Sequence, residues 1–188
     1  MLAIVCRMPR RLRDKTAGTF HVYAHSVWAA SALFRDDVDR NAFLRELARA
    51  TAKVEWTCIG FCLMTTHYHL ILDVQDGSLP LGMHALNFRY ACQFNARHGM
   101  RGHAFGARYD SVRIDSDEHL LTAYKYTVMN PVRAGICDRP ESWPWSSYAG
   151  TIGAAEPHSF VEDSRILECF DGPRELAVAR LRSFVELS

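Results

Sequence analysis

The stretch CLMTTHYHLILDV, residues 62–74, decides the fold class of this chain. From position 67 onward apolar side chains occupy every second place, and side chains two apart on a strand point to the same face of a sheet. His67 and His69 would therefore project together from one face. The opposite face would carry an apolar row suited to a core, made of Tyr68, Leu70, Leu72 and Val74. The pattern predicts a strand that is buried on one face and displays two imidazoles on the other.

The segments on both sides of this strand predict an alternation of strands and helices. Runs rich in β-branched and aromatic residues indicate strands at 19–28, 55–64, 68–74 and 109–114. Apolar residues at helical spacing, bounded by caps and breakers, indicate helices at 36–53, 80–97 and 116–129. Pro131 ends the last of these helices. The order predicts an α+β fold in which helices cover one face of an antiparallel sheet.

Length and composition are those of a folded globular protein. The chain has 188 residues, of which 48% are hydrophobic and 23% charged. We expect a main domain at 1–150 that begins with a basic arm at 1–17, and a short helical appendage at 151–188. No apolar run is long enough for a membrane span, and no secretory signal is visible, so we expect a cytoplasmic protein that does not bind membranes.

The six cysteines do not form a disulfide framework, which fits reduced thiols in the cytoplasm. Cys58 and Cys62 have a spacing that zinc sites also use. They lie inside an apolar run and without a second cysteine pair, which is the usual situation of core residues. The sequence therefore favours a core role over a zinc site.

Charge is segregated along the chain although the net charge is only +1. The arm is rich in cations, including Arg10, Arg11 and Arg13. A second basic segment carries Arg89, Arg97, Arg101, Arg108 and Arg113, interleaved with aromatic residues from Phe88 to Tyr109. Cations along the backbone and rings that stack on bases are what single-stranded nucleic acid requires. We predict that these eight arginines contact DNA, with an ordinary solvated charged face as the alternative.

Two further features are typical of catalytic chemistry. Paired imidazoles such as His67 and His69 make a natural two-point metal site, although a histidine pair on a solvated face is the alternative. Tyr126 and Asn130 lie four residues apart on one helical face, whereas Tyr124 faces nearly the opposite way. A tyrosine can act as a covalent nucleophile, and an asparagine oxygen suits Mg²⁺ or Mn²⁺. The alternatives are a buried tyrosine and an asparagine that merely ends a helix.

Several segments, read together, resemble the REP-associated tyrosine transposases of the HUH superfamily. The resemblance runs from about residue 18 to 148, and its segments occur in the family's order. They are FHVYAHSV at 20–27, FRDDVDRNAFL at 34–44, CLMTTHYHLIL at 62–72, RYACQFNARHGMRGHAFGARYDS at 89–111, KYTVMNPVRAG at 125–135 and WPWSSY at 143–148.

The resemblance implies a ferredoxin-like fold with the histidine pair on a central strand. It implies that His67 and His69 are paired ligands of a divalent metal ion, Mg²⁺ or Mn²⁺, and that Asn130 is the third ligand. Tyr126 matches the catalytic tyrosine. The implied partner is single-stranded or hairpin DNA, and the protein would be a monomer or homodimer associated with the bacterial nucleoid. The family usually has Pro-Asn directly before its histidine pair, where this chain has 65–66, Thr-Thr.

The implied reaction cuts and rejoins DNA through a 5′-phosphotyrosine, and other functions compete with it. A replication-initiator or relaxase-like nickase shares the chemistry, but 188 residues leave no room for a helicase or primase module. A domesticated DNA-binding protein could keep the fold without cleavage, although the presence of His67, His69 and Tyr126 argues against it. An RNA-binding ferredoxin-like module would need no metal ion.

Overall fold

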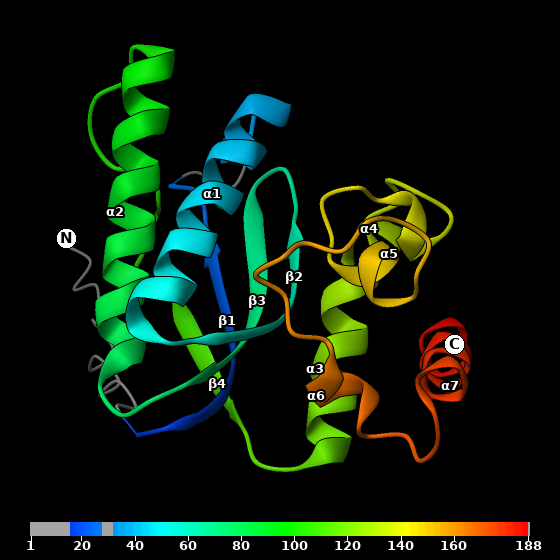
Figure 1. Ribbon diagram of the computed structural model, residues 1–188. Coiled ribbons are helices and arrows are strands. Elements are labelled where there is room, and N and C mark those ends of the chain that lie inside the picture. The colour runs from blue at the N-terminus through cyan, green and yellow to red at the C-terminus, as the bar shows by residue number, and fades with distance from the viewer. Residues whose placement is uncertain (1–15, 28–31, 188) are drawn as a thin grey trace, which may run out of the picture.

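The computed structural model describes residues 16–27 and 32–187 and shows an α+β architecture (Figure 1). The elements of the main part are β1 (Gly18–His25), α1 (Asp37–Val54), β2 (Thr57–Leu63), β3 (His67–Val74), α2 (Ser78–His98), β4 (Asp110–Ile114) and α3 (Asp117–Val128). The C-terminal part contains α4 (Asn130–Arg133), the 3₁₀ turn η1 (Pro140–Ser142), α5 (Tyr148–Thr151), α6 (Ser164–Leu167) and α7 (Arg174–Glu186). The predicted order of strands and helices is confirmed.

The four strands form an antiparallel sheet in the order β2-β3-β1-β4. With two crossover helices, this is the ferredoxin-like arrangement. The strand that carries the histidine pair, β3, is therefore central, as the resemblance implied. Its neighbour β1 pairs with it in a register that places His25 opposite His67 and Tyr23 opposite His69.

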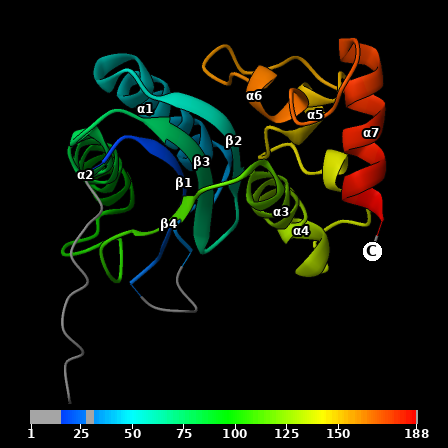
Figure 2. The same ribbon diagram turned by 90° about the horizontal axis from the view of Figure 1, so that it is seen from below.

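One face of the sheet packs against α1 and α2, as Figure 2 shows from below. The predicted apolar row of β3 is completely buried in this core. The Tyr68 ring, for example, lies with its centroid 4.7 Å from that of Phe43 in α1. Cys58 and Cys62 are also fully buried as free thiols, and burial raises the pKa of Cys58 to about 12. The expectation that these cysteines belong to the core is confirmed.

The prediction that helices lie on one face holds for α1 and α2 but does not extend to α3. Helix α3 packs against the other face, where Ile59 of β2 and Ile71 of β3 join Leu120 and Tyr124 in a second core. Because both strands carry apolar residues on both faces, the sheet needs cover on each side. Figures 1 and 2 show α3 on the side of the sheet away from α1 and α2.

The C-terminal segment contributes to this second core. It is helical, as expected of residues 151–188, but its apolar side chains Ile166, Leu167, Ala177, Leu181 and Val185 are buried in the same cluster as those of α3. Lys125 of α3 also donates a hydrogen bond of 2.9 Å to the carbonyl of Phe184. The segment predicted as an appendage thus supports the helix that carries Tyr126. In the described part of the chain, no helix has the length and apolar character needed to cross a membrane.

Candidate active site

The two central strands gather histidines on the sheet face that α3 covers. On β3 these are His67 and His69, and on β1 they are His21 and His25, which sequence reasoning missed. The antiparallel register stacks them in pairs, with ring centroids 4.9 Å apart for His25 and His67 and 5.1 Å apart for His21 and His69. The signal was present in the sequence, since His21 and His25 are four residues apart in HVYAH, and any even spacing places two residues on the same face of a strand.

A hydrogen bond of 2.9 Å joins Nε2 of His21 to Nδ1 of His69 and holds the His69 ring. When His69 Nδ1 carries the shared proton, Nε2 of the same ring keeps its lone pair, which is the form that binds a metal ion. The side chain of Thr66 makes a similar contact of 3.1 Å with Nδ1 of His67. Thr66, directly before the histidine pair, therefore orients a predicted ligand.

Burial lowers the pKa of three of these histidines and so favours their neutral form. It lowers the pKa of His69 to about 2, and the neighbouring histidines lower it further. Burial and His119 lower the pKa of His21 to about 4. The pKa of His67 is also lowered, by burial and by His25, against a hydrogen bond with Asn130 that raises it. Neutral imidazole is the protonation state that metal ligation requires.

Tyr126 lies beside this cluster and is accessible, whereas Tyr124 is not. The Tyr126 side chain is 44% exposed, and its ring centroid is 5.4 Å from that of His69 and 5.8 Å from that of His21. Tyr124 is fully buried, and its hydroxyl donates to Thr151 Oγ1 at 3.1 Å. The two tyrosines thus face opposite ways, as their helical spacing predicts.

Two residues after α3 contact the site. Asn130 donates from Nδ2 to the carbonyl of Tyr126 at 3.0 Å, and its side chain is close enough to His67 to raise the pKa of that imidazole. Arg133, which sequence reasoning missed, places its guanidinium carbon 5.2 Å from the centre of the Tyr126 ring. A cation over this ring favours negative charge on the phenolic oxygen. The turn after α3 therefore brings a ligand candidate and a cation to the predicted nucleophile.

An open cavity of about 450 Å³ lies between β1, β3 and α3. The side chains that line it include His21, His25, His67, His69 and Tyr126. Asn130 contacts His67 without lining this cavity. The cavity is large enough to admit a phosphate group and its neighbouring sugar between the tyrosine and the imidazoles.

The donor set fits a divalent ion of intermediate softness. In the described part of the chain, no group of three or more His, Cys, Asp or Glu side chains is arranged to hold a metal ion. The predicted set is different in kind, because it combines the imidazoles of His67 and His69 with the amide of Asn130. Two neutral imidazoles and an amide oxygen suit Mn²⁺ better than Mg²⁺.

The predicted DNA-binding arginines differ in whether they already form ion pairs or hydrogen bonds within the protein. Arg97 is held by Asp36 at 2.6 Å and by Asp39 at 2.5 Å, a network that ties α2 to the start of α1. Arg113 donates from Nε to Asp115 at 2.9 Å and from Nη2 to the carbonyl of Ala17 at 3.0 Å. These two guanidiniums serve the fold, which leaves them less able to bind phosphate.

The remaining arginines of the second basic segment are exposed. Arg89 lies 3.9 Å from the buried Glu46 at the edge of an ion pair. Arg101 and Arg108 make no ion pair within residues 16–27 and 32–187. The arm residues Arg10, Arg11 and Arg13 lie outside the described residues. Among the predicted DNA-binding arginines that the structure describes, Arg101 and Arg108 are therefore the most available to a phosphate backbone.

Fold and site together define a class of protein: a ferredoxin-like sheet with a histidine pair on a central strand and an accessible tyrosine on the helix that follows the sheet. Among solved structures, the chain is similar to that of a REP-associated tyrosine transposase bound to a REP hairpin. The TM-score is 0.68 at 13% sequence identity, over 89% of this chain and 96% of that one. No protein-family model and no curated protein matches the chain. The likeness shows that the fold is that of the structure named.

Proposed function

We propose that this protein is a transposase-type endonuclease that cleaves and rejoins single-stranded or hairpin DNA, with Tyr126 as its nucleophile. The observation that carries the proposal is the position of Tyr126, exposed on α3 with its ring 5.4 Å from that of His69. The structural neighbour was solved with a hairpin bound, which supports hairpin DNA as the partner.

The reaction would begin when the phenolic oxygen of Tyr126 attacks a backbone phosphorus. A bond forms between that oxygen and phosphorus, and the bond to the 3′-oxygen breaks. The phenol loses its proton and the departing 3′-oxygen gains one, so the strand ends as a 5′-phosphotyrosine and a free 3′-OH. Because the energy of the phosphodiester is conserved in the covalent intermediate, a 3′-OH can later reverse the attack and join a new partner.

The surrounding side chains would favour this attack in separate ways. Arg133, 5.2 Å from the Tyr126 ring, stabilises the developing phenolate. His21 fixes the orientation of the His69 ring through their 2.9 Å hydrogen bond. A divalent ion would be held by His67, His69 and Asn130, and when bound it supplies Lewis-acid polarisation of the scissile phosphate.

The nucleophile is tested by trapping the covalent adduct. The wild-type protein, incubated with Mn²⁺ and a labelled library of single-stranded DNA hairpins, should form a protein–DNA adduct that mass spectrometry places on Tyr126. Tyr126→Phe should fold normally, bind DNA and form no adduct. Tyr124→Phe is the matched control, since its ring is buried in the second core, and it should keep the adduct. A nucleotide found on Tyr124 would show that the nucleophile is wrong.

The metal dependence is tested on the ligands. His69→Ala and His67→Ala should bind hairpins but fail to cleave them, because the predicted DNA-binding arginines supply most of the affinity and none of those described lines the cavity of the imidazoles. Both variants should also lose the binding of Mn²⁺ in the absence of DNA, which is measured by calorimetry. Equal cleavage by His69→Ala in metal-depleted buffer would contradict the role. Hairpin binding by the wild type with no adduct under any divalent ion would favour the domesticated binding protein.

A further inference from the structure

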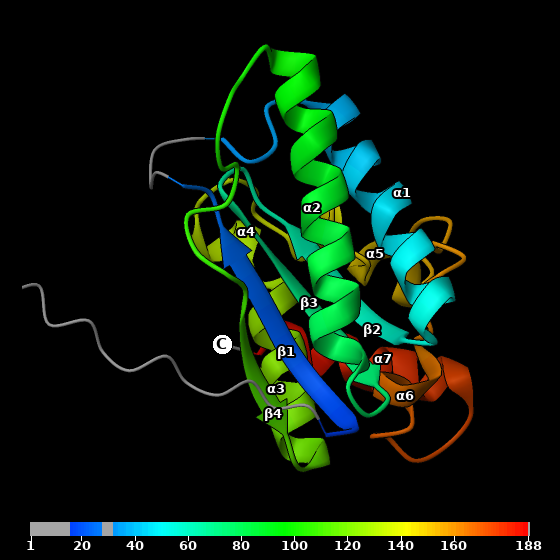
Figure 3. The ribbon, with the colours of Figure 1, turned by 90° about the vertical axis from the view of Figure 1, so that its left-hand side faces the viewer.

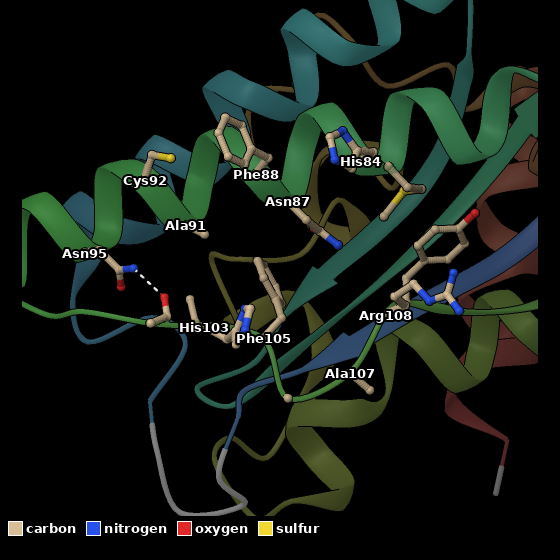
Figure 4. A pocket seen from close by; sticks show the side chains of 15 residues that line it. His84, Asn87, Phe88, Ala91, Cys92, Asn95, His103, Phe105, Ala107 and Arg108 are labelled. Carbon is tan, nitrogen blue, oxygen red and sulfur yellow. Dashed lines mark hydrogen bonds between the residues drawn. The ribbon is translucent and has the colours of Figure 1, made fainter. Parts of the chain in front are cut away.

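A second cavity lies between α2 and the segment that leads into β4. Its volume is about 590 Å³, and it is bounded by α2 and by residues 102–109 (Figure 4). Asn95 of α2 holds this segment by donating from Nδ2 to the carbonyl of Gly102 at 2.8 Å. The cavity is on the face of the sheet opposite the histidine cluster, because Met83 and Tyr109 at its base belong to the first core.

The inner wall of this cavity presents one flat ring and one oriented amide. The ring of Phe105 is partly buried and rests against Tyr68 and Tyr90 at centroid distances of 6.2 Å. The buried hydroxyl of Tyr68 donates to Oδ1 of Asn87 at 2.8 Å, which leaves Nδ2 as the end of the amide that is open to a ligand. Nδ2 of Asn87 points toward the cavity in Figure 4 and makes no hydrogen bond within the described residues.

The rim of the cavity is cationic and aromatic. Arg108 projects from the segment, and the exposed ring of Phe88 lies parallel to that of His84 on α2. None of the described residues that line the cavity is acidic. An aromatic surface, a free amide donor and a nearby cation suit an unpaired nucleobase with its phosphate. A neutral apolar ligand would interact with neither the cation nor the amide.

The segment that forms the cavity wall is joined by backbone hydrogen bonds to the end of β1, which contributes histidines to the candidate active site. Gly106 donates from its backbone nitrogen to the carbonyl of His25 at 3.1 Å, and Val27 donates to the carbonyl of Ala104 at 3.0 Å. The approach is so close that a Cβ at Gly106 would lie 2.7 Å from the carbonyl oxygen of Ser26. Since His25 stacks on His67, a DNA strand bound at the histidine cluster would lie close to this wall.

We propose that this cavity binds one unpaired nucleobase in the single-stranded flank of the DNA substrate. The base stacks on Phe105, accepts a hydrogen bond from Nδ2 of Asn87 and has its phosphate near Arg108. The subsite would select the position of the strand relative to Tyr126, and so the inference rests on the proposed function. It adds a specificity site on the face of the sheet that the catalytic tyrosine does not reach.

The experiment uses the full-length protein and a hairpin with a single-stranded flank. Each flank nucleotide is replaced in turn by an abasic residue, which keeps the phosphate but removes the base, and affinity is measured by fluorescence anisotropy. One flank position should lose about tenfold in affinity, the factor expected for a single stacked base, while the others change little.

Two variants should remove this position dependence. Asn87→Asp keeps the acceptor for Tyr68 but replaces the amide donor with a negative charge, and Phe105→Leu keeps the apolar contact with the core but removes the flat ring. Both should bind intact and abasic flanks equally and still form the Tyr126 adduct. Asn41→Asp, the same substitution at an exposed position of α1, is the matched control and should behave as the wild type.

The outcomes separate this inference from the proposed function. An equal response to every abasic substitution, or a position dependence that persists in both Asn87→Asp and Phe105→Leu, would overturn the subsite while adduct formation at Tyr126 leaves the endonuclease intact. A wild-type protein that neither binds the hairpin nor forms an adduct would overturn both. Loss of the position dependence in the two variants alone supports the subsite.

Discussion

Acidification should destabilise the protein through the buried imidazoles of His21 and His69. Burial, together with the neighbouring His119, His67 and His25, lowers the pKa of His21 to about 4 and that of His69 to about 2. In the unfolded chain both groups titrate near pH 6.5, as model histidines do. Between the folded pKa of each histidine and its unfolded pKa near 6.5, the unfolded state therefore binds more protons than the folded state. The stability is fully present above about pH 6.5 and is lost as the pH falls through that value toward the folded pKa.

The size of the effect follows from the position of the two folded pKa values. At about pH 5 an unfolded histidine is stabilised by roughly 2 kcal/mol through protonation, because one pH unit corresponds to about 1.4 kcal/mol. His21 and His69 stay largely neutral in the folded state at this pH. Since their rings share one hydrogen bond, the sum of about 4 kcal/mol is an upper bound. This is a large part of the roughly 5–15 kcal/mol by which a domain is stable.

This reasoning is tested by urea denaturation, monitored by tryptophan fluorescence at about pH 7.5 and at about pH 5. EDTA is present at both pH values to exclude metal binding. The wild type and His21→Gln should both lose stability between about pH 7.5 and about pH 5. The loss in free energy of unfolding should be smaller in His21→Gln than in the wild type, by roughly 2 kcal/mol. His84→Gln removes an exposed imidazole of α2 and is the control. Carboxylates contribute equally to all three proteins and cancel. An identical loss in the wild type and in His21→Gln would refute the argument.

Three further predictions concern stability and are measured by chemical denaturation. Tyr124→Phe should lower the free energy of unfolding by about 1 kcal/mol through its lost buried hydrogen bond, whereas Tyr126→Phe should leave it unchanged; the reverse order would contradict the assigned orientations. Gly60→Ala should cost roughly 1–3 kcal/mol, because a Cβ there would lie 2.8 Å from Cε2 of Tyr124, and a neutral result would mean that this ring can move. Asp39→Ala should cost about 2 kcal/mol or more, since Asp39 is 2% exposed and binds Arg97, and an unchanged midpoint would show that the network adds nothing.

Local signals were sufficient to predict the strands and helices. Asp36, for example, caps α1 by accepting hydrogen bonds from the backbone nitrogens of Val38 and Asp39. The acidic pair at 36–37, directly before a helical pattern, predicts this cap. The layer of α3 could not be predicted in this way. Ile59 and Ile71 indicate that their strands are apolar on a second face, but which distant segment covers that face depends on tertiary packing.

The candidate site was predictable only where its residues are neighbours in sequence. His67 and His69 are two residues apart, and Tyr126 and Asn130 are four apart, so one periodicity relates each pair. The contact of His21 with His69 spans 48 positions and depends on the strand register. Charge counting along the chain predicts that Arg97 contacts DNA, but it does not detect the partner Asp36, which is 61 positions away. Long-range pairing is what the sequence alone leaves undetermined.

Strand β1, the blue arrow in Figure 3, contributes to two different environments. Its side chains alternate, with Phe20 and Val22 in the first core and His21 and Tyr23 lining the cavity of the histidine cluster. This alternation is compatible with the exchange of one apolar residue for another but not with a change in length. A one-residue insertion or deletion within β1 would turn its imidazoles toward α1 and α2 and its apolar side chains toward the cavity. Among descendants of this gene, the apolar residues of the segment can therefore vary while its residue count stays fixed.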